Sequence, residues 1–107
     1  MGPITAAGIG VGGLGTGLRD MRSPVGPVTL FDSAPFRSHI AAEVNLFNAA
    51  DFIASKRASR LDRFVQFSLS STKLAIEDAD LDPSSVDPAR SAVQIVSARG
   101  VIAHAEV

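Results

Sequence analysis

The 107-residue chain contains no cysteine, and that absence excludes several kinds of site at once. Disulfide bonds, thiolate metal ligands and a cysteine nucleophile all need a side chain that these residues do not supply. The two histidines, His39 and His104, lie far apart, and neither has the spacing to a second ligand that metal sites use. We therefore expect neither a metal nor a cofactor.

Long apolar runs and an excess of charge of one sign are also missing. No run approaches the roughly 20 residues of a membrane span, and no basic stretch followed by an apolar block marks a secretory signal. The formal net charge of −1 gives no general attraction to nucleic acid or to anionic membranes. These features predict a cytoplasmic protein that binds neither. The 46% of hydrophobic residues suffices for the core of one domain.

The distribution of the apolar residues indicates an α/β fold class. Four segments are predicted to be extended, because they are apolar or alternate in polarity: residues 3–11, 28–31, 38–44 and 91–98. After the first of them, only residues 18–22 could form a helix before Ser23-Pro24, since a residue that precedes proline is biased away from the helical region. Asn48 is expected to cap a short helix that follows it.

The strongest periodic signal covers residues 59–82 and predicts one long buried helix. Small and apolar residues recur at helical spacing along one stripe, while Phe64 and Phe67 carry apolar character around the cylinder. Ser59 and Asp62 have the spacing of a capping box at its start. A helix that crosses over between strands predicts a few-stranded mixed sheet with at least one parallel pair. Such a sheet needs more cover than one helix provides, so the domain is expected to be incomplete.

A glycine-rich stretch near the N-terminus matches the dinucleotide fingerprint G-x-G-x-x-G at Gly10, Gly12 and Gly15, and Asp32 follows at about the right distance. Dinucleotide binding needs a helix of some three turns after the glycines, and residues 18–22 are too few for one. Asp32 moreover lies in a turn sequence. The pattern therefore favours another interpretation, in which the glycines allow tight backbone packing at the end of a buried strand.

Four longer segments of the chain follow one another in a recognisable order. They are GIGV…LGTG, GPVTLFDSAPFRSHIAAEV, SRLDRFVQFSLSSTKLAIEDADLD and DPARSAVQIVSA. Their order resembles the N-terminal region of the elongating β-ketoacyl-acyl carrier protein synthases, and most of all the ketosynthase subunits of bacterial type II polyketide systems. The resemblance covers nearly the whole chain. It implies that residues 1–107 are an incomplete N-terminal fragment of a thiolase-like fold.

The resemblance also implies a chemistry, the decarboxylative Claisen condensation of fatty-acid or polyketide biosynthesis. Family members hold the acyl chain on a cysteine and stabilise the enolate with two histidines, all beyond the equivalent of the last residue here. His39 and His104 do not match those motifs. The chain alone is therefore expected to be catalytically incomplete. The alternative that stays open is a truncated or degenerate product, or a partner like a chain-length factor, docking on a ketosynthase or a carrier protein.

The chain departs from the family pattern in four places. The sequence Gly12-Gly13-Leu14-Gly15 stands where the family usually has V-T-P-x-G, and the first helix is expected to be reduced to residues 18–22. Asp80 stands where the family has the glycine that ends the long helix, and a left-handed cap without glycine costs about 1 kcal/mol. Arg99 aligns with a residue of the acyl pocket, where an unpaired guanidinium is costly.

The one candidate binding site within the chain is a group of basic residues before and at the start of the long helix: Lys56, Arg57, Arg60 and Arg63. Positive charge there, and acids at the other end of the helix, oppose the helix dipole. A solvated surface is one interpretation. The family resemblance implies the other, a docking site for the acidic recognition helix of acyl carrier protein. In the family the further partner is a ketosynthase-type subunit, in a homodimer or a heterodimer.

Overall fold

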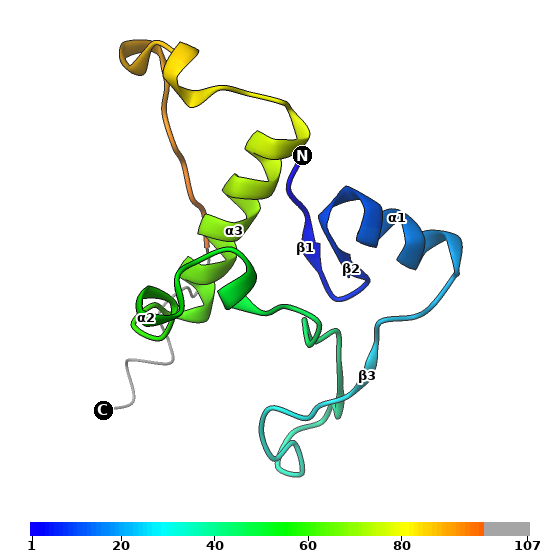
Figure 1. Ribbon diagram of the computed structural model, residues 1–107. Coiled ribbons are helices and arrows are strands. Elements are labelled where there is room, and N and C mark those ends of the chain that lie inside the picture. The colour runs from blue at the N-terminus through cyan, green and yellow to red at the C-terminus, as the bar shows by residue number, and fades with distance from the viewer. Residues whose placement is uncertain (98–107) are drawn as a thin grey trace. The chain divides into compact units, whose positions relative to one another are not determined.

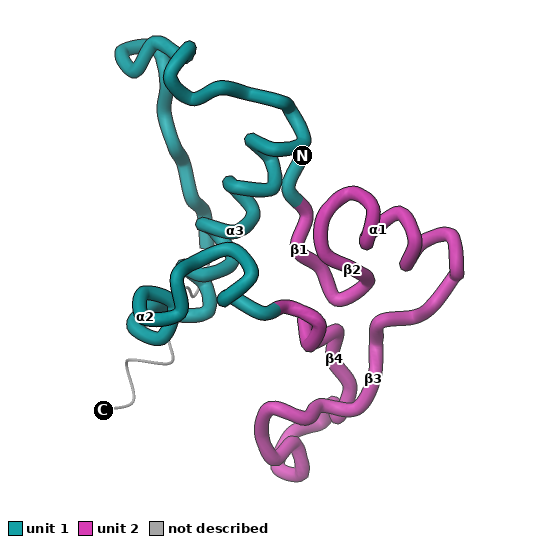
Figure 2. The backbone as a smooth tube through the Cα atoms, in the orientation of Figure 1, with its two compact units in different colours: residues 1–2, 48–107 teal, residues 3–47 magenta. Residues whose placement is uncertain are grey.

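The computed structural model describes residues 1–97, and the chain divides into two compact units (Figure 2). Unit 1 comprises Met1–Gly2 and Asn48–Val107, and unit 2 comprises Pro3–Phe47. Helices and short strands both occur, so the α/β class is confirmed. No helix among the described residues is long and apolar enough to cross a bilayer.

Unit 2 begins with a tight hairpin instead of the single strand predicted for residues 3–11. Strand β1 (Ile4–Thr5) pairs antiparallel with β2 (Gly8–Ile9), and Ile4 lies opposite Ile9. The Thr5 side chain closes the turn, because its hydroxyl donates to the carbonyl oxygen of Gly8 (2.9 Å) and accepts from the Gly8 amide (3.1 Å). These local bonds reverse the chain where the apolar pattern alone predicts that it continues straight.

The glycine-rich stretch is helical, which corrects the prediction that only residues 18–22 could be. Helix α1 runs over Gly10–Arg19 and lies beside the hairpin (Figure 1). The prediction placed the glycines in a loop and counted helical residues only from there to Ser23-Pro24, and glycine disfavours a helix interior by about 1 kcal/mol relative to alanine. Tertiary packing outweighs that cost: a Cβ on Gly17 would lie 2.2 Å from the Ala7 carbonyl oxygen. Close backbone packing is thus confirmed for Gly17, but the prediction is wrong for Gly12 and Gly15, where an added Cβ atom would meet nothing within 4 Å.

A second antiparallel pair joins β3 (Gly26–Pro27) to β4 (Ile40–Ala41), with Gly26 opposite Ala41. The prediction of extended structure at residues 38–44 is confirmed only for the two residues of β4, and residues 28–31 form no strand. The Val28 amide still donates to the His39 carbonyl oxygen (2.9 Å), but at the next two residues a side chain replaces the backbone partners. The Glu43 carboxylate accepts hydrogen bonds from the amides of Thr29 (2.9 Å) and Leu30 (3.2 Å).

The bonds to Glu43 predict a pH dependence for this loop. The Thr29 hydroxyl donates to the carboxylate (2.6 Å), and with the two amides it lowers the pKa of Glu43 from 4.5 to about 2. A lowered pKa means that the contribution to stability is present above pH 4.5 and is lost as the pH falls toward about 2. The amide resonances of Thr29 and Leu30 should shift over that window. Glu43→Gln should remove the transition, and a midpoint near 4.5 would contradict the bonding.

Unit 1 starts from a capped 3-10 turn, η1 (Ala49–Asp51), in which the Asn48 side chain accepts from the Ala50 amide (3.2 Å). The predicted Asn48 cap is thereby confirmed. Helix α2 (Ser55–Ala58) follows, and α3 (Arg63–Asp78) is the longest helix of the chain's described part.

The predicted capping box at the start of the long helix is wrong. Ser59 ends α2 and donates to the Lys56 carbonyl oxygen (3.2 Å), while Asp62, the N-cap of α3, makes no side-chain cap bond. Gln66 links the two helices, because its side-chain amide donates to the carbonyl oxygens of Ala58 (2.9 Å) and Leu61 (3.0 Å). The turn between α2 and α3 is therefore held from within α3.

Helix α3 is amphipathic, but it is not buried on the several sides that the apolar residues around its circumference predict. Ser70 is its one buried residue, and among the described residues of unit 1 the buried apolar side chains are Ile53 and Ala58. Periodicity reports which faces are apolar, and it carries no information on what covers them. The N-terminal residues lie along α3, where the Met1 amino group binds the Asp78 carboxylate and Ser71 donates to the Gly2 carbonyl oxygen.

The predicted second buried strand, residues 91–98, is wrong for residues 91–97, and residue 98 lies outside the described part. Two 3-10 turns, η2 (Pro83–Ser85) and η3 (Pro88–Arg90), precede residues 91–97, which are not assigned to a strand and in which Val93 is 81% and Val96 is 83% exposed. The β structure of residues 1–97 is accordingly two separate antiparallel pairs, not a mixed sheet with a parallel pair.

The end of α3 confirms the left-handed cap expected at Asp80, whose φ is 47°. The Asp80 amide donates to the Glu77 carbonyl oxygen (3.1 Å) and the Leu81 amide to that of Ile76 (3.1 Å), the two bonds of a Schellman motif. Asp80→Gly should therefore raise the free energy of unfolding by about 1 kcal/mol, measured by urea denaturation. Asp80→Ala removes the charge but keeps the Cβ atom, so it should raise the free energy of unfolding clearly less than Asp80→Gly does. An equal increase in the free energy of unfolding for both variants would contradict a conformational cost at the left-handed backbone of Asp80.

Candidate functional site

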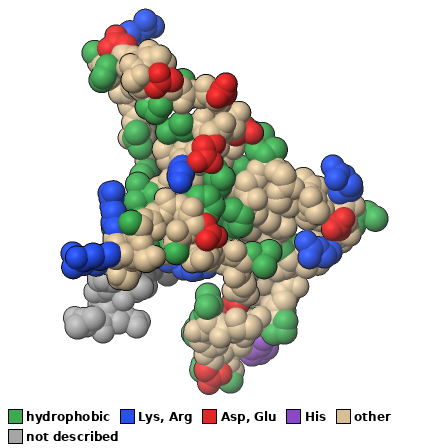
Figure 3. Space-filling view, in the orientation of Figure 1, with side chains coloured by type: hydrophobic (Ala, Val, Ile, Leu, Met, Phe, Trp, Pro, Cys, Tyr) green, Lys and Arg blue, Asp and Glu red, His purple; other side chains and the backbone are tan. Residues whose placement is uncertain are grey.

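The four predicted basic residues all lie on the surface of unit 1 around α2, and we call them the basic cluster. Lys56 and Arg57 belong to α2, Arg60 lies in the turn that follows, and Arg63 is the first residue of α3. All four are exposed. In the space-filling view, Lys and Arg side chains occupy the side of unit 1 where Figure 1 labels α2 (Figure 3).

Most of the charge in the basic cluster is not neutralised within the described residues. The ion pairs of residues 1–97 join the Met1 amino group to Asp78 and Lys73 to Glu77, so none involves Lys56, Arg57 or Arg60. Arg63 differs from these three, because its guanidinium lies over the Phe67 ring, 4.9 Å from the centroid. Such a contact fixes the side chain while leaving its charge.

The charges at the two ends of α3 oppose the helix dipole, as the sequence indicates. The first turn contains no acid and begins with Arg63, and the last turn contains no base. The Met1 amino group offsets part of the cost at the far end by binding Asp78. Arrangements of this kind lower helix stability by about 0.3–1 kcal/mol per well-placed charge, so the basic cluster is not explained by the stability of α3.

A surface pocket of about 280 Å³ adjoins the basic cluster and shares Arg57 with it. It is lined by Phe52, Ile53, Ala54, Arg57, Leu69 and Lys73. The wall on the α3 side consists of Leu69 and Lys73, which are one turn apart on that helix. Sequence reasoning missed Lys73 because the pocket depends on how the segment around Ile53 packs against α3. Its four-residue spacing from Leu69 was the one available signal.

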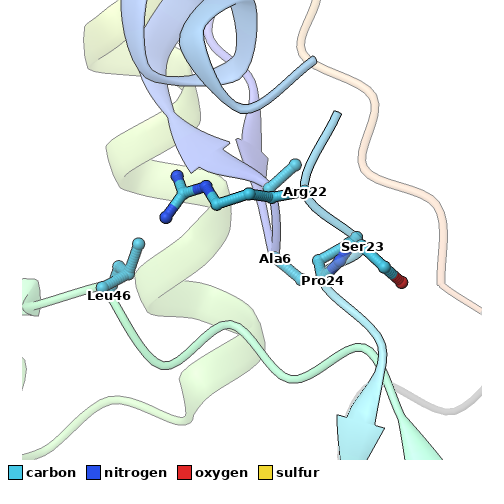
Figure 4. Close-up of a pocket in the computed structure, with 6 residues that line it drawn as sticks. Ala6, Arg22, Ser23, Pro24 and Leu46 are labelled. Atoms are coloured by element: carbon cyan, nitrogen blue, oxygen red, sulfur yellow. The ribbon is translucent and has the colours of Figure 1, made fainter. Parts of the chain in front are cut away.

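Unit 2 has a smaller pocket of about 100 Å³, lined by Ala6, Ala7, Arg22, Ser23, Pro24 and Leu46. Figure 4 shows the Arg22 guanidinium extending toward Leu46, while the Ser23 hydroxyl points away. The Ser23 oxygen accepts a weak hydrogen bond from the Val25 amide (3.3 Å). An exposed cation beside a hydroxyl that points out of the pocket carries no proposal for this pocket.

The remaining sequence candidates are not brought together. Arg99 and His104 lie outside the described residues. His39 is exposed, with its Nδ1 atom 3.3 Å from the Ser33 hydroxyl. Among residues 1–97, no group of three or more His, Asp or Glu side chains could hold a metal ion.

The glycine motif does not form a dinucleotide site, although the reason differs from the one expected. A helix follows β2, but Gly10, Gly12 and Gly15 lie inside it and not in a loop before it. The element that precedes α1 is an antiparallel hairpin, whereas the dinucleotide fold needs a parallel βαβ unit. The Asp32 carboxylate accepts from the Ala34 amide (3.0 Å), which confirms its place in a turn.

Comparison with known proteins gives relatives along most of the chain, although no family model matches it. The granaticin polyketide putative beta-ketoacyl synthase 1 of Streptomyces violaceoruber is 35% identical over 103 residues, 89% of this chain and 24% of that protein. The tetracenomycin polyketide synthase ketoacyl synthase alpha subunit of Streptomyces glaucescens is 35% identical over 105 residues, 91% of this chain and 25% of that protein. The 3-oxoacyl-[acyl-carrier-protein] synthase 2 of Synechocystis sp. is 36% identical over 81 residues, 76% of this chain and 20% of that protein.

These alignments cover very different shares of this chain and of the relatives. They cover about nine tenths of this chain for the polyketide proteins, but the chain spans only about a quarter of the length of the relatives it matches. Similarity of this kind is consistent with the expected correspondence to one segment of a larger protein.

Proposed function

We propose a function for this chain from the premise that it belongs to the beta-ketoacyl synthase family. It supplies the N-terminal segment of a 3-oxoacyl-acyl carrier protein synthase of polyketide or fatty-acid assembly, within a thiolase-like fold. Support comes from relatives that are 35% identical over about nine tenths of the chain. Both kinds of synthase occur among the relatives, so the pathway is left as either one.

The reaction of such a synthase is a decarboxylative condensation. The malonyl thioester loses CO₂, and the resulting carbanion attacks an acyl thioester held on the enzyme thiol, so that a carbon–carbon bond forms and the thiol is released. These 107 residues contain no cysteine to carry the acyl group. In this proposal the chain therefore contributes to the fold and to the recognition of the carrier protein, and performs no condensation alone.

The basic cluster is the observation that carries the proposed role in recognition. Three of its cations are exposed and form no ion pair within residues 1–97. The acidic helix of an acyl carrier protein is complementary to such a surface. Exposed charges of this kind steer the encounter and orient the partner more than they add affinity, and salt screens them over about 10 Å at 0.1 M.

A binding experiment tests the proposal directly. The labelled chain is titrated with a holo acyl carrier protein of a bacterial type II polyketide system, at low and at high salt. We expect saturable binding at low salt that weakens steadily as salt is added. A malonyl-dependent condensation assay on the chain alone should give no product. Absence of carrier binding at low salt would remove the recognition role, and product formation by the chain alone would refute catalytic incompleteness.

The non-catalytic alternative, a degenerate product or a partner like a chain-length factor, also fits a chain without a thiol. The expected reduction of the first helix to residues 18–22 would have favoured degeneration, but α1 spans Gly10–Arg19 and removes that argument. Addition of a ketosynthase subunit to the assay separates the two. A docking partner should bind that subunit and alter the product it makes, whereas a detached segment should do neither.

A further inference from the structure

The pocket beside the basic cluster combines an apolar floor with two cations. Ile53 is 9% exposed and Leu69 38% exposed, so both side chains present apolar surface to the pocket without being shielded from solvent altogether. Arg57 and Lys73 lie on its lining and come from different helices, α2 and α3. An occupant that satisfies both features must be apolar at its centre and anionic beside it.

The volume of the pocket limits what the occupant can be. At about 280 Å³, it lies just below the about 300–1,000 Å³ of sites that bind whole small molecules. A single large apolar side chain presented by a partner protein suits this space. Residues three and four apart are neighbours on a helix. A single helix of the partner can therefore present an apolar side chain with acidic side chains on either side of it.

The charge at the pocket is free to engage a partner. Arg57 has no ion pair among the described residues. Lys73 has Glu77 one turn away, at 4.0 Å, with both side chains more than half exposed. Exposed pairs of this type contribute little, so an incoming carboxylate can displace Glu77.

We infer that this pocket receives an apolar side chain of the acidic helix of acyl carrier protein, while Arg57 and Lys73 bind the acids that flank it. The inference rests on the proposed function and extends it. The docking surface runs from the basic cluster onto α3, and Lys73 and Leu69 join the residues that recognise the carrier. Charge draws the carrier in, and the apolar side chain in the pocket sets its position.

Two substitutions in the 107-residue chain test the pocket against the holo acyl carrier protein at low salt. Leu69→Gln keeps a good helix former but removes the apolar floor, and should weaken binding about 10-fold. Lys73→Glu should weaken it about 5-fold, and the loss should shrink as salt is added. Matched controls are Leu18→Gln, at an exposed leucine of α1, and Arg90→Glu, at an exposed cation of η3; both should change the affinity less than about 2-fold.

The outcomes separate this inference from the proposed function. If the wild-type chain binds the carrier and the two pocket variants behave like their controls, the pocket inference is wrong and the docking role of the basic cluster stands. If the wild-type chain does not bind, both fall. Methyl resonances of Ile53 and Leu69 should shift on binding of the carrier. If the chain instead self-associates and Leu69→Gln abolishes that, the occupant is a second copy, and the inference is also overturned.

Discussion

Replacement of Gly17 by alanine is expected to lower the free energy of unfolding by about 3 kcal/mol, the upper part of the range for overpacking. The added Cβ atom would lie 2.2 Å from the Ala7 carbonyl oxygen and 3.0 Å from the carbonyl carbon. These are backbone atoms of the β1–β2 hairpin, so no side-chain rotation relieves the overlap. The hairpin or α1 must shift, and their mutual contact is lost. Urea denaturation followed by circular dichroism measures the change.

Gly15 provides the matched control within the same helix. A Cβ atom built there meets nothing within 4 Å, so Gly15→Ala should raise the free energy of unfolding by about 0.5–1 kcal/mol through the better helix propensity of alanine. The two substitutions add the same atoms to the same helix two residues apart, and differ only in what they meet. Similar effects from both would mean that the hairpin does not pack on the Gly17 face of α1.

The features that the sequence predicts well are those that depend on neighbours in the chain. The long helix of residues 59–82 is present as α3, Arg63–Asp78, because its repeat of apolar and small residues is itself local. The cap by Asn48 and the left-handed Asp80 are confirmed for the same reason, since each is defined by a few consecutive residues.

The features that the sequence predicts poorly are those decided by contacts across the fold. The sequence predicts too short a helix before Ser23-Pro24, whereas α1 packs closely on the hairpin, with Gly17 against Ala7 and Gly13 against Gly8. The apolar runs at residues 3–11 and 91–98 predict buried strands, but a strand forms only where a partner strand lies beside it. Residues 3–11 fold back on themselves as a hairpin, and residues 91–97 form no strand.

The candidate site also has one part that depends on neighbours in the chain and one that depends on contacts across the fold. The basic cluster follows from positions close in the chain, and the sequence locates it at Lys56 and its neighbours. The adjoining pocket brings Ile53 to Leu69 and Lys73, which requires knowing how the segment before α2 lies against α3. The charge pattern of the sequence therefore does not reveal its apolar floor.

Charge reversal at Lys56 and Arg60 together is expected to weaken the binding of acyl carrier protein about 30-fold at low salt. Both side chains are exposed and form no ion pair within residues 1–97, so Lys56→Glu with Arg60→Glu changes the surface potential without breaking a described ion pair. Arg63 is left unchanged, since its reversal would also remove the contact with Phe67. Isothermal titration at several salt concentrations measures the loss, which should shrink as screening increases.

The control for this double variant must carry the same change in net charge elsewhere. Arg37→Glu with Arg90→Glu does so at two exposed positions outside the basic cluster. If attraction between the cluster and an acidic helix guides docking, the control should lose less than about 3-fold through the general change in charge. Equal losses in both double variants would mean that overall charge, and not this surface, governs the encounter. A large loss confined to the cluster would tie the family's carrier protein to α2 and the turn that follows it.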